Sequence, residues 1–100
     1  MYQRIIRYRT KPDQADANAK LVEAVYAELH RTQPEGLSYA TFRLADGVTF
    51  IHVVQVVNEP NPLFTIKAFD EFQAGIADRV DQPPAQEELT EVGSYRFFAS

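Results

Sequence analysis

The segment from Pro34 to His52, PEGLSYATFRLADGVTFIH, constrains the fold of this chain more than any other stretch. Two runs of strand-forming residues, 37–44 and 48–57, meet at Asp46-Gly47. Asp-Gly favours a tight type I′ turn, because both central residues of that turn need positive φ. Pro34-Glu35-Gly36 before the first run is typical of a turn that ends a helix. The pattern therefore predicts a β-hairpin between two helical segments.

The flanking segments supply a further strand and two helices. Residues 2–10 alternate and are rich in Ile, Tyr and Arg, which predicts a first strand. A helix is expected to begin near Asp13, which can accept from the backbone amides of the first turn. A second helical pattern follows the hairpin and should place Phe64, Phe69 and Phe72 against the sheet.

The C-terminal part is harder to read because it contains Pro83 and Pro84. We expect residues 81–84 to form a linker, residues 85–90 to form one more helical turn, and residues 92–98 to form the last strand. The resulting order, βαββαβ, predicts a single α+β domain over residues 1–100. Its expected architecture is ferredoxin-like, a four-stranded antiparallel sheet with both helices on one face.

Composition limits the functions open to the chain. A chain of 100 residues with 45% hydrophobic residues has room for one core. Its net charge is -4 and its basic residues are scattered, so we expect no nucleic-acid partner. Without cysteine there are no disulfides, thiolate metal sites or thiol nucleophiles. We expect a cytoplasmic protein with no membrane partner, because no apolar run resembles a signal core or a membrane span.

The strand expected over residues 48–57 is apolar on both faces. Phe50, Val54 and Val56 alternate with Ile51 and Val53, and two helices can cover only one face of the sheet. A soluble monomer rarely exposes so large an apolar face, so we expect a homodimer in which a second copy covers it. The alternative is a monomer whose C-terminal segment folds across the open face.

His52 is the first candidate for a catalytic residue. It lies in the middle of an apolar strand, where an imidazole must find hydrogen-bond partners. A histidine there could act as a base or anchor a ligand near neutral pH. The alternative interpretation is a core or interface histidine whose nitrogens are satisfied by tyrosine or backbone groups.

Tyr8, Tyr39 and Arg43 are the candidate substrate-binding residues. Tyr39 and Arg43 share one face of their strand, and Tyr8 lies on the first strand. A phenol beside a guanidinium suits a phenolate or carboxylate ligand, so these side chains could line the mouth of a pocket. Alternatively, tyrosine is simply a favoured strand residue and the arginine lies along the sheet with its charge in water.

The sequence lacks the residue patterns typical of metal sites, phosphate-binding loops and nucleophile elbows. His30 and His52 lie on different elements without an accompanying carboxylate cluster, so we expect no metal. The four glycines form neither a dinucleotide fingerprint nor a phosphate-binding loop, and no nucleophile elbow is present. We therefore expect no cofactor.

The order of elements and several local patterns resemble the dimeric α/β-barrel superfamily. These patterns are Lys11-Pro12 after the first strand, the turn at residues 34–37, and the Asp46-Gly47 hairpin followed by Phe50 and His52. The chain is most similar to stand-alone domains of the antibiotic biosynthesis monooxygenase type, over nearly its whole length. The resemblance implies that two sheets pack into a barrel between subunits, with a small ligand between sheet and helices.

The resemblance also implies candidate activities. Some members oxidise aromatic polyketides without metal or flavin, and others degrade haem; both groups use an Asn and a Trp near the cavity, with a His or Arg nearby. This chain departs from that pattern, because it has no Trp and because Asn18, Asn58 and Asn61 are expected on a helix and a loop rather than on the first strand. The departure disfavours haem degradation and also counts against cofactor-free oxygenation by the same residues.

Two hypotheses of different kinds follow. The first is a cofactor-independent monooxygenase-like enzyme that acts on an aromatic or apolar small molecule, with His52 as the catalytic residue. The second is a non-enzymatic module that binds a small ligand or serves for dimerisation.

Overall fold

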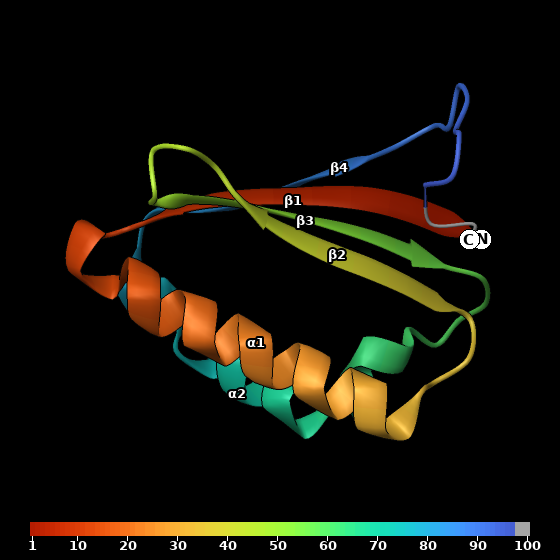
Figure 1. Cartoon of the computed structure of the whole chain (residues 1–100), viewed down its shortest axis with the longest axis horizontal. Helices are drawn as coiled ribbons and strands as arrows, with labels where there is room; N and C mark the ends of the chain where they lie inside the picture. Colours follow the sequence, from red (N-terminus) through yellow and green to blue (C-terminus); the bar gives the residue numbers. More distant parts are fainter. Residues whose placement is uncertain (98–100) are drawn as a thin grey trace.

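The computed structural model describes residues 1–97 and has two layers, an antiparallel sheet and a layer of helices on one face (Figure 1). The strands are β1 (Tyr2–Thr10), β2 (Leu37–Arg43), β3 (Thr49–Val56) and β4 (Val80–Glu88), in the spatial order β2-β3-β1-β4. The helices are α1 (Ala15–Thr32), α2 (Lys67–Ala74) and α3 (Ile76–Arg79), with 3-10 turns η1 (Pro12–Gln14) and η2 (Pro62–Thr65). The predicted ferredoxin-like α+β fold is confirmed.

The last strand begins earlier than the sequence indicated. β4 occupies residues 80–88, so the predicted linker at 81–84 and helical turn at 85–90 are wrong. The strand predicted at 92–98 is also wrong over its described part, because residues 92–97 contain no regular element; Phe98 lies outside the described residues.

Prolines are tolerated in β4 because it is an edge strand. It pairs only with β1, and the register shifts between the pairs Arg7–Ala85 and Arg9–Gln82. In this bulge Pro83 and Pro84 lie opposite a single residue of β1, so neither interrupts a continuous ladder.

The hairpin between β2 and β3 is confirmed, but its predicted type I′ turn is wrong. Gly47 has a φ of +78°, whereas Asp46 is not among the residues with positive φ. The Asp46 carboxylate instead accepts from the N–H groups of Val48 and Thr49, both at 2.9 Å, and from the Thr49 hydroxyl at 2.6 Å. The hydroxyl bond, with the two backbone bonds, lowers the pKa of Asp46 to about 2. A side chain thus organises a longer connection than the Asp-Gly pair suggested.

Replacing Gly47 with alanine should destabilise the protein by about 1 kcal/mol, because an L side chain is disfavoured at this positive φ. The added Cβ would meet no atom within 4 Å, so the backbone conformation alone carries the effect. Gly93 is the matched control, since its Cβ would also meet nothing and its φ is not positive. Urea unfolding should show a lower free energy of unfolding for Gly47→Ala and an unchanged one for Gly93→Ala. Equal urea midpoints for the two variants would contradict this account.

The core lies between the sheet and the helices. Alternate residues of β1 and β3 point into it and meet the inner faces of α1 and α2. Its buried members include Tyr8, Val25, Phe50, Val54, Val56, Leu63, Ile66, Phe69 and Phe72. Phe64, which was expected in this stripe, is 62% exposed, because it belongs to η2 and the regular helix begins only at Lys67.

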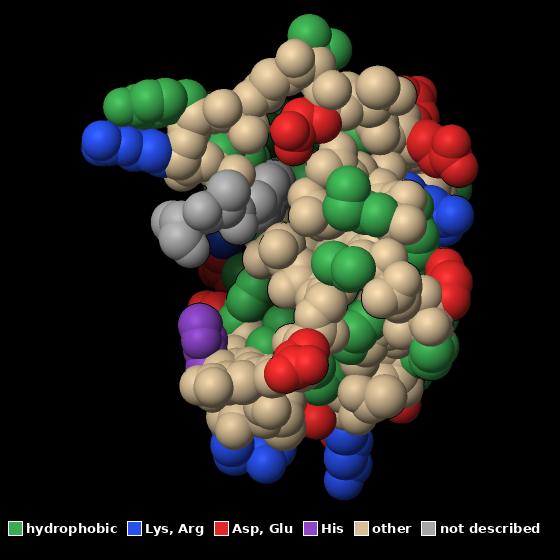
Figure 2. Space-filling model, turned by 90° about the vertical axis from the view of Figure 1, so that its right-hand side faces the viewer, with side chains coloured by type: hydrophobic (Ala, Val, Ile, Leu, Met, Phe, Trp, Pro, Cys, Tyr) green, Lys and Arg blue, Asp and Glu red, His purple; other side chains and the backbone are tan. Residues whose placement is uncertain are grey.

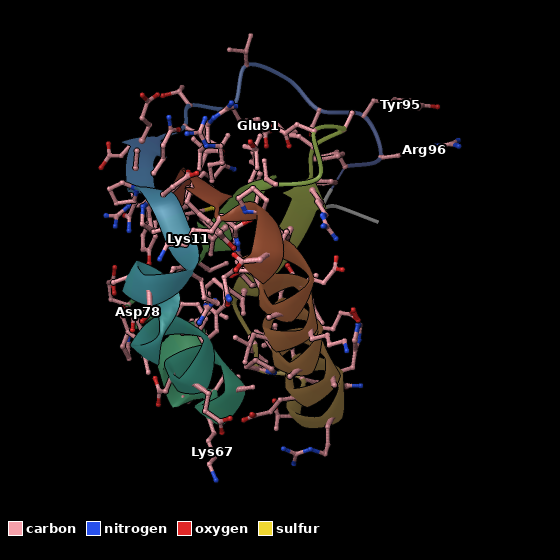
Figure 3. The ribbon with its side chains drawn as sticks, turned by 90° about the vertical axis from the view of Figure 1, so that its left-hand side faces the viewer. Lys11, Lys67, Asp78, Glu91, Tyr95 and Arg96 are labelled. Atoms are coloured by element: carbon pink, nitrogen blue, oxygen red, sulfur yellow. The ribbon has the colours of Figure 1, made fainter. Side chains whose placement is uncertain are left out.

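The two main helices run side by side beneath the sheet (Figures 1 and 3). The carboxylate of Glu28 on α1 accepts from the N–H groups of Lys67 and Ala68, at 3.0 and 2.9 Å. These N–H groups belong to the first turn of α2 and have no partner within the helix. The bond from Ala68 is the main reason that the pKa of Glu28 is lowered. This contact fixes α2 against α1 and so places one wall of the cavity described below.

Within residues 1–97, no helix covers the opposite face of the sheet (Figure 1). The residues that point to this side include Ile5, Phe42, Ile51 and Val53, which pair across β1, β2 and β3. The segment 89–97 leaves β4 on this side, but Val92 is 100% exposed. Tyr95 and Arg96 point away from the body of the molecule in Figure 3, and hydrophobic side chains project clear of it at the top of Figure 2. The described part of the C-terminal segment therefore leaves its apolar side chains exposed.

Candidate functional site

A cavity of about 180 Å³ lies between the inner face of the sheet and α2, open to solvent on one side. Most of its wall is apolar or aromatic, and the residues that form this part include Ile6, Val54, Leu63, Phe69, Phe72 and Ile76. Its polar wall contains the hydroxyl groups of Tyr8 and Tyr39, the imidazole of His52, and the half-buried guanidinium group of Arg4. A mostly apolar cavity with a few convergent polar groups is typical of a small-molecule site.

His52 lies at the centre of the polar wall and is only 3% exposed. Its Nε2 lies 2.8 Å from the Tyr8 hydroxyl, and its Nδ1 lies 2.5 Å from the Tyr39 hydroxyl. Thr41 places its hydroxyl 3.2 Å from the same Nδ1. The strand register explains this convergence, because β1 and β2 flank β3. His52 pairs with Ile6 on β1 and with Thr41 on β2. Tyr8 lies two residues from Ile6, and Tyr39 lies two residues from Thr41, so both tyrosines are on the same face as His52.

Burial keeps these three side chains neutral at pH 7. Burial lowers the pKa of His52 to about 4 and raises the pKa of Tyr8 to about 12, where the bond from Asn18 and the charge of Arg79 act in the opposite direction. Burial also raises the pKa of Tyr39. Tyr8, Tyr39 and His52 therefore present dipoles and exchangeable hydrogens, and Arg4 supplies the positive charge on this wall.

The structure brings together three of the four candidate site residues named from the sequence. Tyr8, Tyr39 and His52 form one hydrogen-bonded group on the cavity wall, whereas Arg43 does not line the cavity. Its Nε donates to the Gly47 carbonyl at 2.7 Å, and its Nη2 pairs with an Asp16 carboxylate oxygen at 3.1 Å. The contacts of His52 also agree with the alternative interpretation, in which tyrosines satisfy a core histidine.

Sequence reasoning missed Asn18, which contacts this group directly, and Arg79, which contacts it through Asn18. Asn18 on α1 is fully buried, donates from Nδ2 to the Tyr8 hydroxyl at 2.8 Å, and accepts at Oδ1 from Nε of Arg79 at 3.1 Å. Its position relative to Ala15, Val22 and Val25 was a usable signal, because that helical spacing places an amide on the buried face of α1. Arg79 gave no such signal, since it lies in a four-residue helix whose packing the sequence does not reveal.

Within residues 1–97, no group of three or more His, Cys, Asp or Glu side chains could hold a metal ion. None of the helices in this range combines the length and apolar character needed to cross a bilayer.

No protein-family model matches the sequence, and no protein with a curated description matches it either. Solved structures do match. A Nitrosomonas europaea protein provisionally described as an antibiotic biosynthesis monooxygenase covers 93% of this chain and 100% of its own, at 13% identity and a TM-score of 0.76. The chain has the antibiotic biosynthesis monooxygenase-like fold. The resemblance inferred from the sequence is confirmed at the level of fold.

Two further solved structures share this fold. A Caulobacter crescentus protein with the same provisional description is 16% identical, with a TM-score of 0.69, and the match covers 92% of this chain and 90% of that one. A Methanosarcina mazei protein described without an activity is 12% identical, with a TM-score of 0.70 and coverage of 89% and 91%. At such identities the likeness concerns the fold, and the activity must be argued from the site itself.

Proposed function

We propose that the protein is a homodimeric, cofactor-independent monooxygenase-like enzyme that acts on an aromatic or otherwise apolar small molecule. The observation that supports this proposal most directly is the neutral group of Tyr39, His52 and Tyr8 on the wall of a mostly apolar cavity. The provisional descriptions of the Nitrosomonas and Caulobacter structures support the same class of reaction.

The size and charge of the cavity narrow the substrate class. Its volume of about 180 Å³ suits one or two fused rings, since an apolar protein cavity of about 150 Å³ holds benzene. Phe69 and Phe72 offer ring faces and edges for stacking. Arg4 is half-buried on the same wall and has no ion-pair partner in the described part of the chain, so it favours a ligand with an acidic oxygen. A phenol of one or two rings meets these conditions.

The proposed reaction uses the substrate as its own reductant. The phenol binds with its oxygen against the Tyr39 hydroxyl, and O₂ attacks the electron-rich ring carbon opposite that oxygen. One oxygen atom of O₂ becomes the new carbonyl, and the other leaves as water with the hydrogens of the phenol O–H and of the attacked C–H. The phenol is oxidised to a quinone by four electrons and O₂ is reduced by the same four, so the reaction requires no further electron donor.

The test is to incubate the protein with 1-naphthol and ¹⁸O₂ and to record oxygen uptake and product mass. The proposal expects one labelled oxygen gained and two hydrogens lost per product, with one O₂ consumed. Bound but unchanged naphthol would favour the second candidate, a non-enzymatic ligand-binding module. One observation supports that candidate, namely that both ring nitrogens of His52 already have partners within the chain.

The proposed homodimer forms through the uncovered face of the sheet. Ile51 and Phe42 pair across strands on this face, Val53 pairs with Ile5, and burial of such side chains drives association. We expect light scattering to show a dimer for the wild type and a monomer for Val53→Asp, because a carboxylate at the centre of this face would be buried without a partner. Lys20→Glu, an exposed change on the helix layer, should remain a dimer. A monomeric wild type would contradict the proposal.

A further inference from the structure

Arg79 is a buried cation without a carboxylate partner among residues 1–97. Its side chain is 7% exposed, and neither of the ion pairs found in this range includes it. Its Nη2 donates to the Phe72 carbonyl at 2.6 Å, and its Nε donates to Oδ1 of Asn18 at 3.1 Å. A guanidinium group can only donate hydrogen bonds. The atom of Asn18 that faces Arg79 is therefore the amide oxygen.

The orientation of Asn18 fixes the role of Tyr8. With its oxygen turned to Arg79, Asn18 offers its NH₂ group to the Tyr8 hydroxyl, 2.8 Å away. The Tyr8 oxygen accepts this bond and must send its own hydrogen elsewhere. Tyr8 is buried, and the other hydrogen-bond partner of its hydroxyl is Nε2 of His52 at 2.8 Å. A buried hydroxyl without an acceptor would be costly, so Tyr8 donates to Nε2.

The protonation of the imidazole follows from this bond. His52 is neutral, so one ring nitrogen carries a hydrogen and the other accepts. Since Nε2 accepts from Tyr8, Nδ1 carries the hydrogen and donates it to the Tyr39 oxygen at 2.5 Å. The hydrogen of the Tyr39 hydroxyl is then free of His52. Its available acceptors are the Thr41 oxygen, which already bonds to the Tyr26 hydroxyl at 2.7 Å, and any acceptor in the cavity that Tyr39 lines.

We propose that Arg79 and Asn18 are positioning residues that set the direction of this chain of hydrogen bonds, so that His52 is held as the Nδ1–H tautomer and Tyr39 acts as a donor toward the cavity. The ligand group beside Tyr39 is then a hydrogen-bond acceptor, such as a carbonyl, phenolate or enolate oxygen. This ligand part rests on the proposed function, whereas the tautomer is a property of the ligand-free protein.

The tautomer is measured by ¹⁵N NMR of the imidazole nitrogens, with His30→Gln used to assign the signals of His52. The wild type should show a protonated Nδ1 and an unprotonated Nε2. In Asn18→Asp, the new carboxylate can only accept, so Tyr8 must donate to it and His52 must donate from Nε2. The tautomer should therefore reverse.

Asn61→Asp is the matched control, because Asn61 is also buried and lines the cavity but uses its Oδ1 only to accept from the Leu63 N–H. It should leave His52 as the Nδ1–H tautomer. A protonated Nε2 in the wild type would overturn the proposal even if Asn18→Asp did not fold. An unchanged tautomer in folded Asn18→Asp would overturn it as well.

The ligand part is tested by titrating two neutral one-ring probes while following the His52 signals. Acetophenone offers only an acceptor, and aniline offers chiefly donors. Acetophenone should bind about tenfold more tightly, as expected for one well-placed hydrogen bond. Tighter binding of aniline would overturn the donor role of Tyr39. If neither probe binds, the result counts against the proposed function and against the role of Tyr39 as a donor to a ligand. The tautomer of His52 would still decide the direction of the hydrogen bonds that run from Arg79 to Tyr39.

Discussion

Tyr39→Phe is expected to lower the turnover of 1-naphthol about 100-fold, which is the loss found when one preorganised hydrogen-bond donor is removed from an active site. The change deletes the hydroxyl that faces both the cavity and Nδ1 of His52. Folding should persist, because Nδ1 keeps the Thr41 hydroxyl at 3.2 Å as a partner. Steady-state oxygen uptake measures the rate, and circular dichroism reports whether the fold is intact.

Tyr26→Phe provides the matched control for this variant. Tyr26 stacks on Tyr39 with ring centroids 5.3 Å apart and bonds to the Thr41 hydroxyl at 2.7 Å, but it does not line the cavity. Its loss should leave turnover nearly unchanged. An active Tyr39→Phe enzyme would remove Tyr39 from the reaction and favour a purely structural role for the hydrogen-bonded group.

The protein should lose about 3 kcal/mol of stability as the pH falls from 6.5 to 4, because of His52. Burial depresses its folded-state pKa to about 4 from the ordinary value of 6.5. In this window the unfolded chain binds a proton that the folded protein excludes. The contribution is therefore complete above pH 6.5 and is lost as the pH falls toward 4. Urea unfolding across this range measures it.

One variant separates His52 from other titrating groups. His52→Gln should lose the pH dependence in this window. Asp46 acts at lower pH. Its stabilising contribution is lost as the pH falls from its ordinary pKa of 3.8 to its folded-state pKa of about 2. Persistence of the full pH dependence in His52→Gln would show that burial of this imidazole is not its cause.

The sheet could be predicted from the sequence where local chemistry and packing agree. The Asp46-Gly47 hairpin and the shared face of Phe50, His52 and Val54 follow from turn residues and from alternation, and the structure has both. Because both faces of this strand are apolar, alternation did not show which of them points inward. β4 could not be predicted in the same way. Its prolines indicate a break, and only its position at the edge beside β1 makes them acceptable.

The sequence predicted most residues of the candidate site, but it did not predict the hydrogen bonds that join them. Tyr8, Tyr39 and His52 stood out individually, but their contact depends on a strand order, β2-β3-β1, that places the first strand beside β3, which is distant in sequence. The Asn18–Arg79 contact depends on how α1 and α3 pack, and neither position carries a motif. Residues joined through tertiary packing leave little trace in a single sequence.

The two prolines of β4 also bear on how copies of this chain can associate. Pro83 and Pro84 carry no N–H to donate, and they lie in the register shift of an edge strand whose other side is free. A strand from another molecule approaching that side would find no donor at these two positions. The β4 edge is thus protected against the strand-by-strand addition from which fibrils grow, whereas the apolar face of the sheet suits a closed assembly.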